Sequence, residues 1–166
     1  MKSLFSLVLV FVMLNIPIRS YASGYPQRVF DNAKLLSSEV DNPNEYGPLQ
    51  SLQGQIWALR ALANYDAAVL LLDDFIGYNT HEDFAKAFYE HMELGVGNDR
   101  SGVLVIVDTY QQCCYVYTVG KCTEYAPTEQ MLNEYADSVL QALNDRKLLG
   151  IRLELLVSCF LPLIPQ

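Results

Sequence analysis

The sequence predicts an α/β fold, a three-layer sandwich in which helices cover a small mixed β-sheet with a central antiparallel hairpin. Three observations carry this prediction. Residues 67–72 form a continuous apolar run whose length suits a strand buried on both faces. Residues 103–108 and 114–119 are two further apolar stretches that a short polar turn separates, so they are expected to pair as an antiparallel hairpin. Segments with helical periodicity alternate with these strands along the chain.

The remaining elements follow in chain order. Residues 25–38 are expected to be an extended segment. Residues 49–64 are predicted to be helical, because their apolar side chains recur at helical spacing. Residues 80–83 have a loose capping-box pattern, which indicates the start of a second helix. A third helix is expected to begin near Pro127, because proline suits the first helical position.

Residues 1–22 have the composition of a secretory signal peptide. Lys2 precedes the apolar stretch 4–14, which is too short to span a bilayer. Ser20 and Ala22 place small residues at −3 and −1 of a cleavage site. The alternative is a retained membrane anchor. A cleaved signal peptide predicts a secreted or extracytoplasmic protein, in the periplasm, a lumen or the cell exterior.

The mature chain is expected to hold one domain, residues 23–150, followed by an apolar tail at 151–166. Removal of Lys2 and Arg19 with the signal peptide changes the formal net charge from −8 to −10. This charge argues against nucleic acid or anionic lipid as the main partner. The tail is compatible with a buried strand or helix, with an end that lies near a membrane, or with truncation of a longer protein.

The cysteines and histidines form no pattern typical of a metal site. No Cys-x-x-Cys occurs, and His81 and His91 are ten residues apart and are expected to face solvent. Pairing of Cys113 with Cys122 is opposed by a separation on the order of 25–30 Å at ~3.3 Å per residue. The four cysteines are therefore interpreted as mostly structural or free: Cys113, Cys114, Cys122 and Cys159.

The best candidate for a functional site lies at the open end of the hairpin. A glycine-rich loop, residues 95–102, leads into the first hairpin strand, and residues 120–124 follow the second. Antiparallel pairing brings these two loops together. We therefore expect Asp99 to lie near Gly120 and Glu124, in a small site that carries carboxylates.

Four segments together resemble the TPM domain family, which is named for a thylakoid lumen protein, a photosystem II repair protein and a modulator of acetylcholine receptors. Residues 29–37 match its opening signature V-x-D-x-A-x-L-L-S. Residues 94–97 are similar to its W-x-I-G, residues 101–105 to its D-N-G-V-L-L, and residues 120–124 to its G-Y-G-L-E. The resemblance covers about residues 28–150.

The chain departs from the family pattern at three places. Arg100 and Ser101 precede Gly102 where the family has D-N-G. Cys122 replaces a glycine of G-Y-G-L-E, and Glu129 replaces the aspartate of the family's L-T-D. The departures at Arg100, Ser101 and Cys122 fall in the two loops of the candidate site.

The resemblance implies a secreted or membrane-tethered accessory domain with a calcium site. Members of the family are reported to bind calcium. Asp31, Asp99 and Glu124 are the expected ligands, because calcium prefers carboxylate oxygens. Asp31 joins this set by the family match alone. The alternative is that Asp31 caps its segment and that the other two are ordinary loop carboxylates.

Two function classes follow. The first is an accessory or assembly module that engages a membrane-protein complex or receptor. The second is a metal-dependent acid phosphatase, the activity described for plant members of the family. The sequence has no assignable Ser-His-Asp series and no Cys-x₅-Arg loop, and only Arg100 and Lys121 are cations near the site. The accessory module is therefore favoured, and no catalytic residue is assigned.

Overall fold

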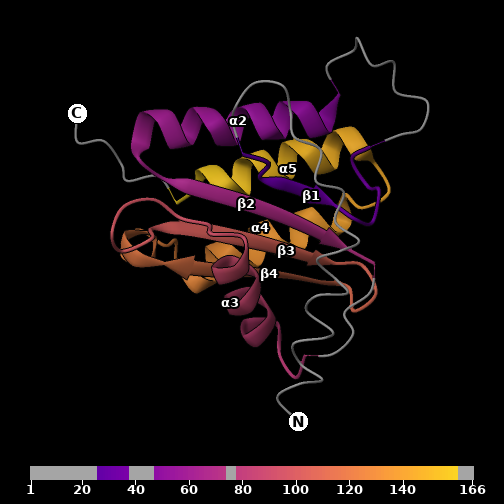
Figure 1. The fold of residues 1–166 in the computed structure, drawn as a ribbon. Coiled ribbons are helices and arrows are strands. Elements are labelled where there is room, and N and C mark those ends of the chain that lie inside the picture. The colour runs from indigo at the N-terminus through magenta and orange to yellow at the C-terminus, as the bar shows by residue number, and fades with distance from the viewer. Residues whose placement is uncertain (1–25, 38–46, 74–77, 161–166) are drawn as a thin grey trace.

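The fold is built around one four-stranded mixed sheet (Figure 1). The computed structural model describes residues 26–37, 47–73 and 78–160. The strands lie side by side in the order β1-β2-β3-β4. Their bounds are Val29–Asp31, Asp66–Leu72, Gly102–Asp108 and Cys113–Val119. Neighbouring strands β1, β2 and β3 are parallel, and β4 returns antiparallel to β3.

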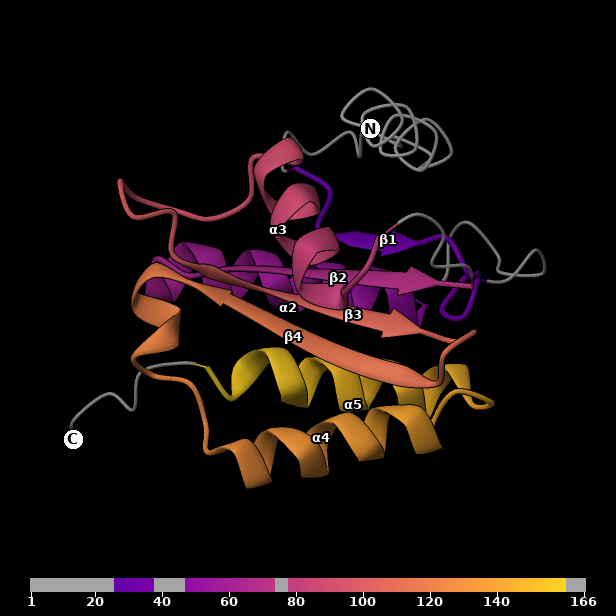
Figure 2. The same cartoon turned by 90° about the horizontal axis from the view of Figure 1, so that it is seen from below.

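Helices cover both faces of this sheet. They are α2 (Pro48–Ala63), α3 (His81–His91), the short 3₁₀ helix η1 (Gly120–Thr123), α4 (Glu129–Gln141) and α5 (Arg146–Ser158). Helix α3 packs on one face, and α2, α4 and α5 pack on the other (Figures 1 and 2). The predicted α/β sandwich is therefore confirmed.

The side chains of the strands alternate between two cores, as a pleated sheet requires. Val103, Val105 and Val107 of β3 enter the larger core beneath α2 and α5. Leu104 and Ile106 enter the smaller core beneath α3. Strand β3 is buried throughout, which explains the unbroken apolar run of residues 103–107.

The antiparallel hairpin was predicted at the centre of the sheet, but it lies at one edge. The extended segment before α2 supplies the three-residue strand β1, which pairs with β2. The other three strands are then β2, β3 and β4, with β4 outermost. A three-residue strand carries too little periodicity to be recognised from sequence.

Threonine side chains begin two of the helices. The Thr80 side chain accepts a hydrogen bond from the backbone N–H of Asp83, which confirms the predicted start of α3. Thr128 caps α4 in the same way, by accepting from the backbone N–H of Met131. Pro127 therefore precedes the cap of α4 and is not its first helical residue.

Helix α5 crosses the boundary expected at residue 150. Leu149, Leu153 and Leu156 are fully buried in the larger core, and the hydroxyl of Tyr65 donates to the Val157 carbonyl at 2.9 Å. The first part of the apolar tail is thus an integral helix of the domain, and residues 161–166 lie outside the described residues. No described helix is both long and apolar enough to cross a membrane.

His81 does not face solvent as expected. Its Nε2 atom lies 3.3 Å from Oδ2 of Asp108, a carboxylate with no exposed surface at the end of β3. Its ring also stacks on Tyr115 of β4. His91 is exposed, in agreement with the prediction. The four cysteines are all unpaired.

Candidate functional site

Two loops meet beside the start of β3 and the end of β4, where Gly102 pairs with Val119. The backbone N–H of Lys121 donates to Oγ of Ser101 at 2.9 Å. Gly120 approaches the first loop so closely that an added Cβ would lie 2.9 Å from the Asp99 carbonyl oxygen. The expectation that Asp99 lies near Gly120 is therefore correct.

The first loop is a tight turn closed by backbone hydrogen bonds. The N–H of Val96 donates to the Ser101 carbonyl at 3.0 Å, and the N–H of Ser101 donates to the Val96 carbonyl at 2.8 Å. Gly95 has a φ of +95°, and a side chain there would collide with the backbone carbonyl of Arg100. The glycine-rich sequence therefore has a steric cause at this position.

Arg100 points away from the candidate site. Its guanidinium donates to the Leu94 carbonyl from both Nε, at 3.0 Å, and an Nη atom, at 2.9 Å. The same group donates to the carbonyl of Tyr89, near the end of α3. Arg100, which the sequence analysis named as a cation near the site, thus ties the loop to α3 through backbone carbonyls.

A pocket of about 500 Å³ opens beside these loops. Its described lining includes Asn98, Asp99, Ser101, Lys121 and Tyr125. Several further residues complete the lining. They come from the two loops, from the junction of α2 with β2 and from the segment after α5, and they are Ala63, Asn64, Tyr65, Val96, Gly97, Cys122 and Phe160. The pocket therefore combines polar and charged side chains with apolar ones such as Ala63 and Phe160.

The charges of the pocket are one carboxylate and one amine. A hydrogen bond from the Ser101 side chain lowers the pKa of Asp99, and Lys121 lowers it further, so Asp99 is ionised at neutral pH. Burial raises the pKa of the Cys122 thiol to about 11, and Asp99 and Asp66 contribute to this rise. Cys122 is therefore a neutral thiol at neutral pH and a poor nucleophile.

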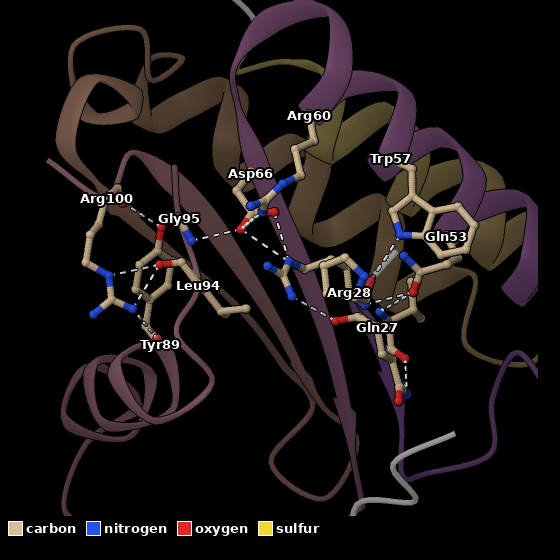
Figure 3. A network of polar contacts seen from close by, with 12 residues as sticks. Gln27, Arg28, Gln53, Trp57, Arg60, Asp66, Tyr89, Leu94, Gly95 and Arg100 are labelled. Carbon is tan, nitrogen blue, oxygen red and sulfur yellow. Dashed lines mark hydrogen bonds and ion pairs between the residues drawn. The ribbon is translucent and has the colours of Figure 1, made fainter. Parts of the chain in front are cut away.

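A network of buried ion pairs and hydrogen bonds adjoins the first loop (Figure 3). Asp66, at the start of β2, accepts from Nε of Arg28 at 2.9 Å and pairs with Arg60 at 2.6 Å. Its Oδ2 atom also accepts the backbone N–H of Gly95 at 2.8 Å. Asp66 therefore joins the segment before β1, the helix α2 and the loop that forms the pocket rim (Figure 3).

Asp31 lies at the other end of the sheet. It pairs with Leu71, which pairs with Val107, five residues along β3 from Gly102. At ~3.3 Å per residue this places Asp31 about 16 Å from the pocket end of the strand. The structure therefore does not bring Asp31 together with Asp99.

The carboxylate of Asp31 caps the turn after β1. Its Oδ1 atom accepts the backbone N–H of Leu35 at 2.8 Å. Its Oδ2 atom accepts the N–H groups of Leu36 and Ser37 and the Ser37 hydroxyl, at 2.8–2.9 Å. These contacts occupy both oxygens with donors, which is the capping role that the sequence analysis gave as the alternative.

Glu124 is exposed at the end of η1 and does not line the pocket. Asp31, Asp99 and Glu124 therefore do not form one ligand set. No group of three or more His, Cys, Asp or Glu side chains that would suit a metal ion occurs among the described residues. Calcium takes six to eight oxygens, and Asp31 lies too far from Asp99 to supply one to the same site.

The first prediction concerns Asp31. Asp31→Ala is expected to lower the free energy of unfolding by about 1–3 kcal/mol, because it leaves backbone N–H groups without their acceptor. Urea unfolding followed by circular dichroism measures this loss. We expect the same loss with and without millimolar calcium. A loss that grows in calcium would instead identify Asp31 as a ligand.

A family model and solved structures agree with this architecture. The model described as the TPM domain matches residues 29–149. The chain belongs to the TPM domain family. A search of curated proteins finds no match.

Three NMR structures share the TPM-domain fold of this chain. The N-terminal domain of a P. gingivalis protein has a TM-score of 0.53 at 18% identity, and the alignment covers 68% of this chain and 71% of that one. The BA42 protein of the psychrophilic bacterium Bizionia argentinensis has a TM-score of 0.54 at 11% identity, over 75% and 88% of the two chains. The N-terminal domain of a Corynebacterium glutamicum protein has a TM-score of 0.51 at 14% identity, over 85% and 82%. At these identities the likeness concerns the fold alone.

Sequence reasoning missed several residues that shape this TPM-domain site. Asn64 and Tyr65 line the pocket from a segment far in sequence from both glycine loops, and Tyr125 lines it from the position directly after the second loop. The sequence analysis did not single out Asp66, because a polar residue directly before an apolar run is usual at the boundary of a strand. A carboxylate directly before a fully apolar strand was the available signal, because such a group becomes buried and then needs cationic partners.

Proposed function

We propose that this chain is an extracytoplasmic TPM-domain accessory module that engages a membrane-protein partner through the pocket beside Asp99 and Lys121. The observation that supports the proposal is the chemistry of the pocket. It offers an ionised carboxylate, an amine and amide groups for recognition. Its buried thiol, Cys122, is held in the neutral form. This combination suits binding better than covalent catalysis.

The alternative proposal is a metal-dependent acid phosphatase. Lys121 favours it, because an amine on the pocket wall offers a positive charge for phosphoryl oxygens. Against it, among the described residues no histidine lines the pocket, and His81 is engaged with Asp108 on the α3 face. Calcium binding remains a proposal too, and Asp99 is the one predicted ligand that lines the pocket.

The second prediction separates these two functions. The mature chain, residues 23–166, should hydrolyse p-nitrophenyl phosphate no faster than a buffer blank at pH 5 and pH 7, with calcium or with chelator. A rate that is abolished by Lys121→Met and retained in the surface variant Lys147→Met would establish the phosphatase and contradict the accessory proposal.

Partner engagement is measured with a photo-crosslinking amino acid at Asn98 on the pocket rim. We expect it to capture a membrane protein from membranes of the source cell. Lys121→Glu should reduce the yield of that product, and Lys147→Glu on α5 should leave it unchanged. Equal yields from both variants would show that the pocket does not hold the partner.

The third prediction concerns localisation. Residues 1–22 lie outside the described residues, so the proposal that they are removed during export rests on their sequence. Mass spectrometry of exported protein should give a new N-terminus within a few residues of Ser23. Recovery of Lys2 on a membrane-embedded product would show a retained anchor.

A further inference from the structure

The outer side of β4 is an open sheet edge. The strand order places β4 last, and no other strand within the described ranges pairs with its free side (Figures 1 and 2). In an antiparallel pair the backbone groups of an edge strand alternate between its neighbour and the open side. About half of the N–H and C=O groups of β4 therefore face outward and suit pairing with another strand.

β4 lacks the features that usually protect such an edge. Its sequence, Cys113–Val119, has neither a charged residue nor a proline. Its register with β3 is continuous over seven pairs, from Asp108 with Cys113 to Gly102 with Val119, so no bulge twists it away. Natural sheets use lysine, proline or bulges to discourage strand addition. This edge is regular enough to accept a strand over its full length.

The side chains beside the edge provide a partly apolar platform. Tyr115 and Tyr117 are half-buried on the α3 side. Tyr117 packs edge-on against Tyr89 at 5.8 Å, and Tyr115 stacks with His81. These contacts fix the tyrosine rings in place, so that an added strand meets ordered side chains.

The two helices that flank β4 are strongly acidic. Both α3 and α4 contact β4. Together they carry six carboxylates and one amine, and they contain no arginine. The carboxylates are Glu82, Asp83, Glu90, Glu129, Glu134 and Asp137, and the amine is Lys86. Glu90 and Glu82 lie near enough to Tyr117 to raise the pKa of its hydroxyl, in addition to the larger effect of burial.

This charge distribution selects the occupant of the edge. A second copy of the chain would bring the acidic helices of both copies toward one another, and like charges oppose such a pairing. A cationic strand is attracted by the same field. Side chains of an added strand alternate between the α3 side and the α4 side, and the helix on each side carries three carboxylates, so the charge favours basic residues on either face.

We propose that the outer edge of β4 docks an extended, basic segment of a partner protein, which adds to the sheet as a fifth strand. Main-chain hydrogen bonds supply the affinity, and the acidic helices supply the preference for lysine and arginine. The proposal goes beyond the accessory function at the pocket, since it concerns another surface. The crosslinking experiment at Asn98 tests the pocket and the peptide experiment tests β4, so a negative result in one leaves the other proposal standing.

A short peptide tests the proposal directly. The probe is the acetylated and amidated heptapeptide Lys-Val-Lys-Val-Lys-Val-Lys, added to isotope-labelled protein and followed by NMR. Amides at alternate positions between Cys113 and Val119 should exchange with solvent about ten-fold more slowly when the peptide is bound. Raising the salt concentration should weaken binding, because the attraction is partly electrostatic.

Three controls distinguish strand addition from other binding. A peptide with glutamate in place of lysine should not bind, and a peptide with a central proline should not slow amide exchange in β4. The double variant Glu82→Gln, Glu90→Gln should bind the lysine peptide several-fold more weakly, whereas Glu154→Gln on α5 should bind as the wild type does. Because both glutamates are exposed, the double variant is expected to fold.

Four results would overturn the proposal. The first is unchanged exchange of the β4 amides in the presence of the lysine peptide. The second is equal binding of the glutamate or proline peptide, which would indicate adhesion without strand pairing or charge preference. The third is a protein that is dimeric without peptide and whose β4 amides already exchange slowly, which would assign the edge to a second copy. The fourth is equal binding by wild type and by the double glutamine variant.

Discussion

Replacing Asp66 by alanine is expected to lower the free energy of unfolding by about 3–5 kcal/mol, the typical result of removing one partner from a buried ion pair. Asp66 has 1% of its surface exposed, and Arg28 has 5%. The change leaves Arg28 buried without its carboxylate, and it removes the acceptor of the Gly95 N–H. Urea unfolding at pH 7, followed by circular dichroism, measures the loss.

The control for this variant is Asp137→Asn on the exposed side of α4, which should change the stability by less than about 0.5 kcal/mol. A double variant adds a sharper test. Arg28→Met combined with Asp66→Ala should cost less than the two single changes together, because the charge left unpaired by one change is removed by the other. Additive losses would show that the two side chains stabilise the fold independently.

Leu156→Ala is expected to cost about 2–5 kcal/mol, as large-to-small changes in a packed core do. Leu156 is fully buried in the core that α5 shares with α2 and the sheet. The measurement is again urea unfolding, and it also tests whether the chain beyond residue 150 belongs to the domain. A loss under about 0.5 kcal/mol would mean that this helix contributes little to the core.

The neighbouring residue provides a matched control. Leu155 has the same side chain one position earlier on α5, but 47% of its surface is exposed. Leu155→Ala should therefore leave the stability within about 0.5 kcal/mol of the wild type. The pair of variants separates the effect of burial from the effect of helix propensity, which is identical for both.

The sequence predicts the long elements of this fold because their periodicity is strong. The strand at 67–72 and the hairpin strands contain enough consecutive apolar residues to exclude a solvated loop, and the structure confirms them with shifts of one residue at several ends. β1 was missed because its pairing with β2 depends on tertiary contact rather than on its own three residues. The sequence left open whether the tail is a strand or a helix, because α5 is apolar on more than one side, with Ile151 and Leu155 exposed.

The candidate site was predicted in part. Antiparallel pairing is a local rule, so the meeting of Asp99 with Gly120 followed from the order of the two loops. The position of Asp31 depends on which part of strand β2 its own strand, β1, pairs with. A match to a sequence motif does not specify that pairing. Its hydrogen bonds to residues 35–37 show that an aspartate of a family motif can cap the turn in which it lies.

The position of α5 in the core has a consequence for how the protein is made. Contacts such as that between Ser51 and Glu154 join residues 103 positions apart. A nascent chain that ends before α5 lacks Leu149, Leu153 and Leu156, so α2 and the sheet have nothing to close the larger core. Contacts this distant in sequence form slowly, because the loop between them must first be closed. The larger core therefore closes only when residues up to the end of α5 are available to pack, so folding of this domain is coupled to nearly its full described length.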